Sequence, residues 1–165
     1  MECAELDLDA AAWTIPAAKM KRGVADKTNG VAHVVPLSAQ AVAILCAIRP
    51  LTGAGQYVFP SVCGGDRPVS NMTLNGVLQR MGINTQSDLT THGFRAMART
   101  MLAERLGVDD VVVEAQLAHS VQDANGRAYN HSQFAEQRCT LMQQWADYLD
   151  RLRNGADVLP IRKTA

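Results

Sequence analysis

The stretch that decides the fold is His92-Gly93-Phe94-Arg95-Ala96-Met97-Ala98-Arg99-Thr100. Apolar residues recur through it at helical spacing as far as Leu102, which predicts a helix over about residues 91–107. His92 and Arg95 are one helical turn apart, so both side chains can face the same point near the start of this helix. The N–H groups at a helix start favour an anion. The stretch therefore predicts a helix whose first turn faces a phosphate-like group.

Four more helices are predicted around this one, over about residues 39–49, 70–81, 110–118 and 132–153. Ser38 can cap the first of them, Pro50 stops it, and Asp109 or Asp110 caps the third. The last helix has the clearest apolar period in the sequence. Trp145 and Tyr148 lie on its apolar stripe, which indicates core or subunit-contact residues.

The N-terminal part alternates apolar and polar residues in three short runs, around Leu6–Leu8, Trp13–Ile15 and Val31–Val35. This alternation predicts three strands, with a long, basic and poorly ordered hairpin loop between the second and the third, over residues 21–30. Tyr57–Phe59 is interpreted as an apolar anchor inside a loop. The predicted fold class is mainly α with a small antiparallel three-stranded sheet. One domain should occupy residues 1–153, followed by a tail over residues 154–165.

Composition excludes several classes of protein. Of the 165 residues, 47% are hydrophobic and 19% charged, which is typical of a globular protein, and no apolar run could span a bilayer. The N-terminus is acidic and does not resemble a secretory signal, so we expect a cytoplasmic protein. The four cysteines are scattered, which argues against a disulfide framework and a zinc finger. The net charge is zero, although Lys19–Lys27 forms a locally basic segment.

Five residues could carry chemistry together, namely Lys21, His92, Arg95, His119 and Tyr129. Singly, each has an ordinary explanation, because such residues more often cap a helix, fill a core or lie in solvent. Together they suit the cleavage of a DNA phosphodiester without a metal or a cofactor. A tyrosine supplies the nucleophile, arginine and two histidines stabilise the charged transition state, and a lysine protonates the leaving oxygen. Arginine fits phosphate oxygens bidentately, whereas lysine can give up a proton.

The chain resembles the tyrosine recombinases, in particular the integrases of satellite-phage and genomic-island type. The resemblance covers about residues 5–150 and rests on seven blocks in the same order: Trp13-Thr14-Ile15-Pro16 with Lys19-Met20-Lys21, His33-Val34-Val35-Pro36-Leu37-Ser38, Tyr57-Val58-Phe59-Pro60, residues 92–100, Gln116-Leu117-Ala118-His119, Ala128-Tyr129-Asn130 and Trp145-Ala146-Asp147-Tyr148-Leu149.

The resemblance implies a role for each candidate residue. Tyr129 would form the 3′-phosphotyrosyl link, and three residues, His92, Arg95 and His119, would bind the scissile phosphate. Lys21 would protonate the leaving 5′ oxygen, with Lys19 and Lys27 as alternatives in the same segment. Arg99 would either meet a neighbouring phosphate or form a surface salt bridge to Glu104 or Asp110.

The resemblance also implies partners, and one departure from the family pattern. A double-stranded DNA attachment site, a homo-tetramer assembled on that DNA by the full-length parent, and a bacterial, nucleoid-associated location are expected. The family uses another catalytic arginine, upstream of the strands and after a DNA-binding domain, but no arginine occurs before Arg22. We therefore expect an N-terminally truncated catalytic domain with little or no recombination activity by itself.

Two other hypotheses remain open from the sequence. The chain could be an incomplete integrase remnant that only binds DNA, or that binds a full-length recombinase through its last helix. It could also be a metal-dependent hydrolase that uses His33, His92, His119 and His131, although it lacks H-x-x-x-H spacing and paired acidic ligands.

Overall fold

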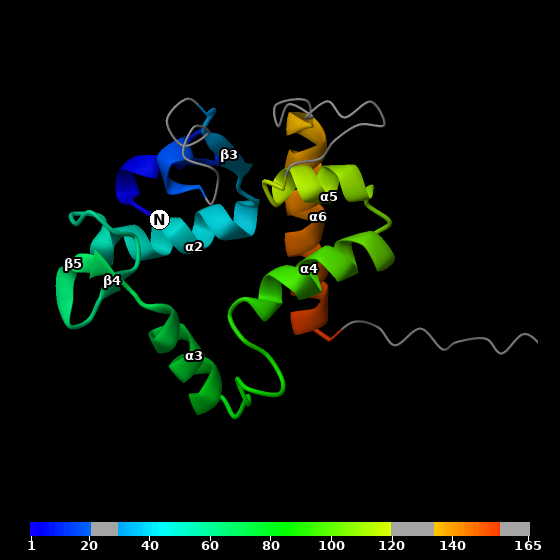
Figure 1. Cartoon of the computed structure of the whole chain (residues 1–165). Coiled ribbons are helices and arrows are strands. Elements are labelled where there is room, and N and C mark those ends of the chain that lie inside the picture. The colour runs from blue at the N-terminus through cyan, green and yellow to red at the C-terminus, as the bar shows by residue number, and fades with distance from the viewer. Residues whose placement is uncertain (21–29, 120–133, 156–165) are drawn as a thin grey trace, which may run out of the picture.

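The computed structural model describes residues 1–20, 30–119 and 134–155 (Figure 1). Four candidate functional residues lie outside this range, namely Lys21, Lys27, Tyr129 and His131, as do nearly all of the predicted hairpin loop and most of the predicted tail. The elements are η1 Cys3–Glu5, β1 Leu6–Asp7, β2 Ala12–Ile15, η2 Ala17–Lys19, β3 His33–Pro36, α2 Ala39–Thr52, β4 Pro60–Ser61, β5 Gly64–Pro68, α3 Asn71–Arg80, α4 Gly93–Glu104, α5 Asp110–Gln116 and α6 Ala135–Arg153.

The N-terminal strands form an antiparallel sheet in the order β1-β2-β3, which confirms the predicted three-stranded sheet. Trp13 lies at its centre, opposite Leu6 on one side and Val35 on the other. Apolar and aromatic neighbours across strands stabilise a sheet, so the alternating pattern predicted this sheet correctly.

The hydrogen-bonded carboxylate of Glu5 links η1 to this sheet. Glu5 accepts hydrogen bonds from the backbone N–H of Glu2 (2.9 Å) and from Nε1 of Trp13 (3.1 Å), and it also pairs with Lys19. Burial, the largest single influence, raises the pKa of Glu5. The three hydrogen bonds outweigh burial and lower that pKa from 4.5 to about 2.

The lowered pKa of Glu5 makes the stability of the fold depend on acid. A carboxylate with a depressed folded-state pKa contributes stability that is fully present above pH 4.5 and is lost as the pH falls from 4.5 towards 2. We expect Glu5→Gln to lower the free energy of unfolding at neutral pH by about 1–2 kcal/mol, allowing for solvent screening. Urea unfolding at a series of pH values measures this. Asp9→Asn, at an exposed carboxylate, is the control, and an unchanged pH profile in Glu5→Gln would contradict the assignment.

Helix α2 is longer than predicted. Ser38 caps it through a hydrogen bond from the backbone N–H of Ala41 (3.3 Å), as expected, but Pro50 does not stop it. The helix continues to Thr52 because Pro50 removes only one backbone donor, and the N–H of Gly53 closes the last turn on the carbonyl of Arg49 (2.8 Å).

A second, two-stranded sheet was not predicted. Strands β4 and β5 pair antiparallel directly after Tyr57–Phe59, where the sequence indicated a loop. Both strands are short and β5 contains two glycines and a proline, so they carry no apolar alternation that could reveal them. The preceding segment is held by the N-terminus, since the N–H of Cys3 donates to the carbonyl of Gln56 (2.9 Å).

The main core lies between α4, α5 and α6, and Figure 1 shows α4 and α5 lying across α6. Its buried members are Leu102, Val112, Val113 and Leu141, and Trp145 packs against them, which confirms its core placement. Gly107 makes the turn from α4 towards α5 with φ +63°, a conformation that favours glycine. Asp109 caps α5, as predicted. Gln40 and Gln143 tie α2 to α6 (2.9 Å).

Helix α3 lies apart from this core in Figure 1, and its apolar side chains are largely exposed. Leu78 is buried, but Leu74, Val77 and Met81 are exposed, as is Ile44 on α2. No element among the described residues packs over these side chains. No helix in the described ranges is both long and apolar enough to cross a membrane.

Candidate functional site

The first turn of α4 carries the predicted His-x-x-Arg pair. The helix begins at Gly93, whose N–H donates to the carbonyl of Thr90 (2.9 Å), and His92 occupies the cap position with an exposed side chain that does not cap the helix. Arg95 follows one turn later, with its backbone N–H on the carbonyl of His92 (3.2 Å). Both side chains therefore start from the same end of α4.

Arg95 and His119 meet although they are far apart in sequence. Nη2 of Arg95 lies 3.0 Å from Nε2 of His119 and also donates to the carbonyl of Leu117. The predicted convergence of Arg95 and His119 is therefore present. Both described contacts of the guanidinium use Nη2, so the N–H groups on Nε and Nη1 are left for an oxyanion.

A tight turn at the end of α5 places His119. The N–H of His119 donates to the carbonyl of Glu114 (3.0 Å), and the N–H of Ala118 donates to that of Ala115 (3.2 Å). This pair of bonds is the Schellman arrangement at a helix end. Ala118 takes the left-handed position that glycine usually fills, at φ 56°, which costs about 1–2 kcal/mol for an alanine. The turn brings His119 back over the last turns of α5.

Glu114 joins the site, although the sequence analysis did not identify it as a functional residue. One carboxylate oxygen accepts from Nδ1 of His119 and the other from Nε of Arg99. Burial, the largest single influence, raises the pKa of Glu114. The hydrogen bonds and charges of Arg99 and His119 outweigh burial, so the pKa is lowered overall. The signal that could have found Glu114 is an acid near the end of a helix that leads into a candidate histidine.

Arg99 has a different partner from the two that were predicted. Its salt bridge goes to Glu114 on α5 instead of Glu104 or Asp110, and Asp110 adds only a weaker attraction. The hydrogen bond that Arg99 donates to Glu114 is the main reason why the pKa of Arg99 is raised. Arg99 lies one turn beyond Arg95, so this bridge joins α4 and α5 beside the site.

A cluster of polar side chains, His33, Gln116 and Arg138, contacts and stabilises the end of α5. Nε2 of His33 donates to the carbonyl of Gln116 (3.1 Å), and Arg138 of α6 donates to the side chain of Gln116 (2.8 Å) and to the carbonyl of Val34 (2.5 Å). His33 and Arg138 are both buried, and burial lowers the pKa of the Arg138 guanidinium. The cluster fixes the segment that leads into His119, and sequence reasoning gave Arg138 no such role.

The remaining candidates are placed as follows. Lys21 and Tyr129 lie outside the described residues, so their roles stay predictions. Lys19 forms salt bridges with Glu2 and Glu5, and the hydrogen bond to Glu2, followed by that to Glu5, raises its pKa. These salt bridges engage the ammonium group of Lys19, and the choice among Lys19, Lys21 and Lys27 as proton donor stays a prediction.

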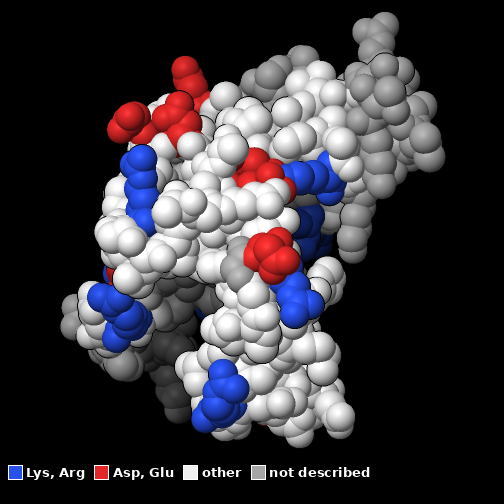
Figure 2. Space-filling model, turned by 90° about the vertical axis from the view of Figure 1, so that its left-hand side faces the viewer, with Lys and Arg blue, Asp and Glu red and all other residues white. Residues whose placement is uncertain are grey.

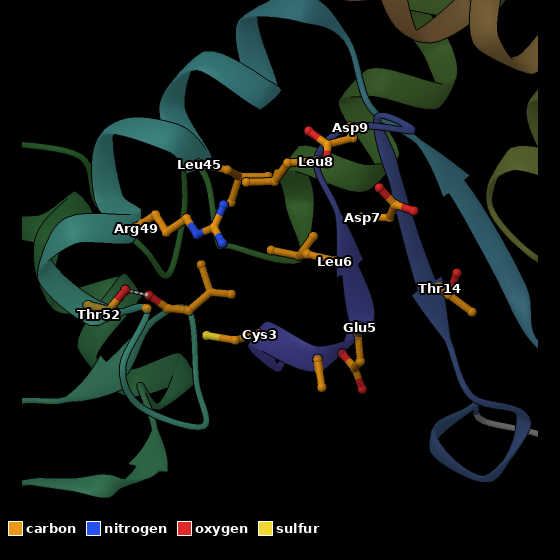
Figure 3. Close-up of a pocket in the computed structure, with 13 residues that line it drawn as sticks. Cys3, Glu5, Leu6, Asp7, Leu8, Asp9, Thr14, Leu45, Arg49 and Thr52 are labelled. Atoms are coloured by element: carbon orange, nitrogen blue, oxygen red, sulfur yellow. Dashed lines mark hydrogen bonds between the residues drawn. The ribbon is translucent and has the colours of Figure 1, made fainter.

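The described surface has two further features, a hollow and scattered charged side chains. A hollow of about 490 Å³ lies between η1, β1 and α2, with Arg49 reaching into it beside Leu6 and Leu45 (Figure 3). It is lined by none of the site residues. On the face in Figure 2, described acidic and basic side chains lie scattered among uncharged atoms. Among the described residues, no group of histidine, cysteine and acidic side chains could hold a metal ion.

Known proteins that are similar to this chain indicate its family. The profile described as "Phage integrase family" matches residues 1–136. The chain belongs to the phage integrase family. Prophage integrase IntA of Escherichia coli (strain K12) is 40% identical over 155 residues, which covers 94% of the chain and 35% of IntA. The integrase of Enterobacteria phage P4 is 37% identical over 156 residues, covering 91% of the chain and 36% of that integrase.

Membership of the phage integrase family confirms the resemblance to tyrosine recombinases and the predicted catalytic-domain fold. No solved structure matches the chain significantly. The chain spans about a third of the length of these phage integrase relatives. The matched residues include α4, α5 and the residues between α5 and α6. The described Arg95–His119 pair therefore lies within the family region.

Proposed function

We propose that this chain is the catalytic part of a site-specific DNA recombinase that cuts and rejoins DNA through a 3′-phosphotyrosine intermediate. One observation carries the proposal: in a member of the phage integrase family, Arg95 and His119 lie 3.0 Å apart beside the start of a helix. This arrangement suits a phosphate, because the guanidinium of Arg95 and the ring of His119 meet near the first turn of α4.

The proposed reaction assigns a role to each group. Tyr129 gives up its hydroxyl proton to solvent as its oxygen attacks the scissile phosphorus, and a Tyr–phosphate bond forms as the bond from phosphorus to the 5′ oxygen breaks. Lys21 gives the proton that the departing 5′ oxygen takes up. Arg95, His92 and His119 stabilise the charge on the non-bridging oxygens. Rejoining is the reverse, with a 5′ hydroxyl as the nucleophile.

The proposed partner is double-stranded DNA at an attachment site, and the full-length parent is expected to act as a tetramer on that DNA. The phage integrase relatives are about three times longer than the chain, so DNA recognition is expected to need further residues. The resemblance also implies a second phosphate-binding arginine, and none precedes Arg22 here. We therefore expect little or no covalent attachment to DNA by the 165-residue chain alone.

A chimaera tests the proposal, with this chain replacing the matching third of the phage P4 integrase. A nicked suicide substrate carrying the phage P4 attachment site should trap a covalent protein–DNA adduct, because the cleaved end diffuses away before rejoining. Peptide mapping should locate the adduct on the peptide that contains Tyr129. An adduct on another residue, or DNA binding without an adduct while the native phage P4 integrase forms one, would contradict the proposed function.

A further inference from the structure

We propose that Glu114 is a positioning residue that holds the His119 ring in the Nδ1–H tautomer, with Nε2 turned towards Arg95 and the phosphate. The inference rests on the proposed function of His119 as a phosphate-binding group. It concerns Glu114, which touches no reacting atom and acts only through His119.

The contacts of Glu114 point to this role. Its side chain is 19% exposed, and both carboxylate oxygens are engaged, one by His119 and one by Arg99. The side chain of His119 is 50% exposed, so its open edge reaches solvent while Nδ1 is held. A carboxylate only accepts hydrogen bonds. The hydrogen between Glu114 and the ring must therefore sit on Nδ1.

The tautomer follows from the second ring nitrogen. When His119 is neutral and Nδ1 carries the hydrogen, Nε2 has a lone pair. That lone pair faces Nη2 of Arg95 at 3.0 Å, and an arginine N–H always donates. Both neighbours thus favour the same tautomer. Nε2 can bind a proton only when Arg95 no longer donates to it, and the resulting imidazolium then donates to a phosphate oxygen through Nε2 and to Glu114 through Nδ1.

The backbone shows that this placement is built into the turn. Residues 114 and 119 would point about 140° apart on a continuous helix. The turn at Ala118, with φ 56°, ends the helix and allows the N–H of His119 to bond the carbonyl of Glu114 (3.0 Å). His119 is therefore held by one residue twice, through its backbone N–H and through Nδ1.

A purely structural role for Glu114 is the competing explanation, because its salt bridge to Arg99 also joins α4 to α5. The two explanations differ in what they predict for the ring of His119. If Glu114 only joined the two helices, the neutral ring of His119 would adopt the tautomer that histidine prefers in water, which is Nε2–H. The positioning role requires Nδ1–H in the neutral ring.

Nitrogen NMR of the 15N-labelled 165-residue chain tests this, at a pH where the imidazole of His119 is neutral. A nitrogen with a lone pair resonates far downfield of one that carries hydrogen, and the loss of signals in His119→Gln assigns the ring. We expect Nε2 to be the downfield nitrogen. A downfield Nδ1 in the unsubstituted chain would overturn the proposal without any appeal to variants of Glu114.

A matched pair of variants separates the two roles. Glu114→Gln preserves the shape of the side chain, but only one of its two terminal groups is a carbonyl that can accept a hydrogen bond. When that carbonyl accepts from Arg99, the amide N–H₂ group faces Nδ1 of His119, and Nδ1 must then carry a lone pair to accept from it. We expect Glu114→Gln to move the ring towards Nε2–H. Arg99→Gln removes the same salt bridge and should leave Nδ1–H in place. An unchanged tautomer in a folded Glu114→Gln chain, or equal shifts in both variants, would overturn the proposal.

The chimaera supplies the functional measurement. Glu114→Gln is expected to slow covalent attachment about 10- to 100-fold, as loss of a supporting partner does at other sites, and to alter its pH profile. An attachment rate and pH profile equal to those of the unsubstituted chimaera would count against positioning. An Nδ1–H ring in a chimaera that never forms an adduct would instead refute the proposed function while Glu114 still positions His119.

Discussion

Tyr129→Phe in the chimaera is expected to abolish covalent attachment to the suicide substrate. Phenylalanine keeps the ring but lacks the oxygen that forms the bond to phosphorus, so no covalent intermediate can arise through this residue. DNA binding should change little, because a single hydroxyl contributes little beside many phosphate contacts. Denaturing gel electrophoresis of the protein–DNA adduct measures the loss, and a gel-shift assay measures binding.

Tyr148→Phe is the matched control for this experiment. Tyr148 lies on α6, where its ring stacks on Trp145 with ring centroids 5.9 Å apart, and phenylalanine preserves that stacking. Attachment should therefore persist in Tyr148→Phe. An adduct that survives Tyr129→Phe would show that another residue is the nucleophile, and the proposed mechanism would fall with it.

Arg95→Ala is expected to reduce the rate of covalent attachment about 10²- to 10³-fold. The loss of one donor that stabilises a developing negative charge has an effect of this size. In this structure Arg95 also contacts Nε2 of His119 and the carbonyl of Leu117, so the substitution removes a link between α4 and the end of α5 as well. Single-turnover cleavage at saturating protein isolates the chemical step from DNA binding.

Arg105→Ala controls for the loss of charge, since it removes an exposed arginine at the other end of α4. It should weaken DNA binding slightly at most and leave the single-turnover rate unchanged. Arg95→Lys retains the charge but not the planar fork of donors, so it should recover only part of the rate. Equal rates in Arg95→Ala and the unsubstituted chimaera would remove Arg95 from the proposed site.

Local sequence patterns predicted several elements of the fold correctly. The sequence predicted the antiparallel sheet around Trp13, the cap Ser38, a cap at Asp109 or Asp110, and a core or subunit-contact position for Trp145. It was wrong about Pro50, because one missing N–H near a helix end is tolerated. It also missed β4 and β5, whose pairing depends on the partner strand and not on apolar alternation.

The exposed stripe of α3 marks another limit of sequence patterns. Leu74, Val77 and Met81 recur at helical spacing along α3, and in the described structure they are exposed. A stripe shows which side of a helix is apolar, but it does not show what covers that side. The chain spans about a third of its relatives, so its own described elements need not supply the cover.

The sequence by itself determined the family-specific blocks, the helix that begins with His92 and Arg95, and the candidates Lys21, His119 and Tyr129. Only the tertiary structure decided that Arg95 meets His119, that Arg99 pairs with Glu114, and that Arg138 and His33 support the end of α5. The physical reason is that helical period relates residues three or four apart, whereas these pairs depend on how α4, α5 and α6 pack. Glu114 and His119 meet because the turn at Ala118 reverses the chain, which no helical spacing predicts.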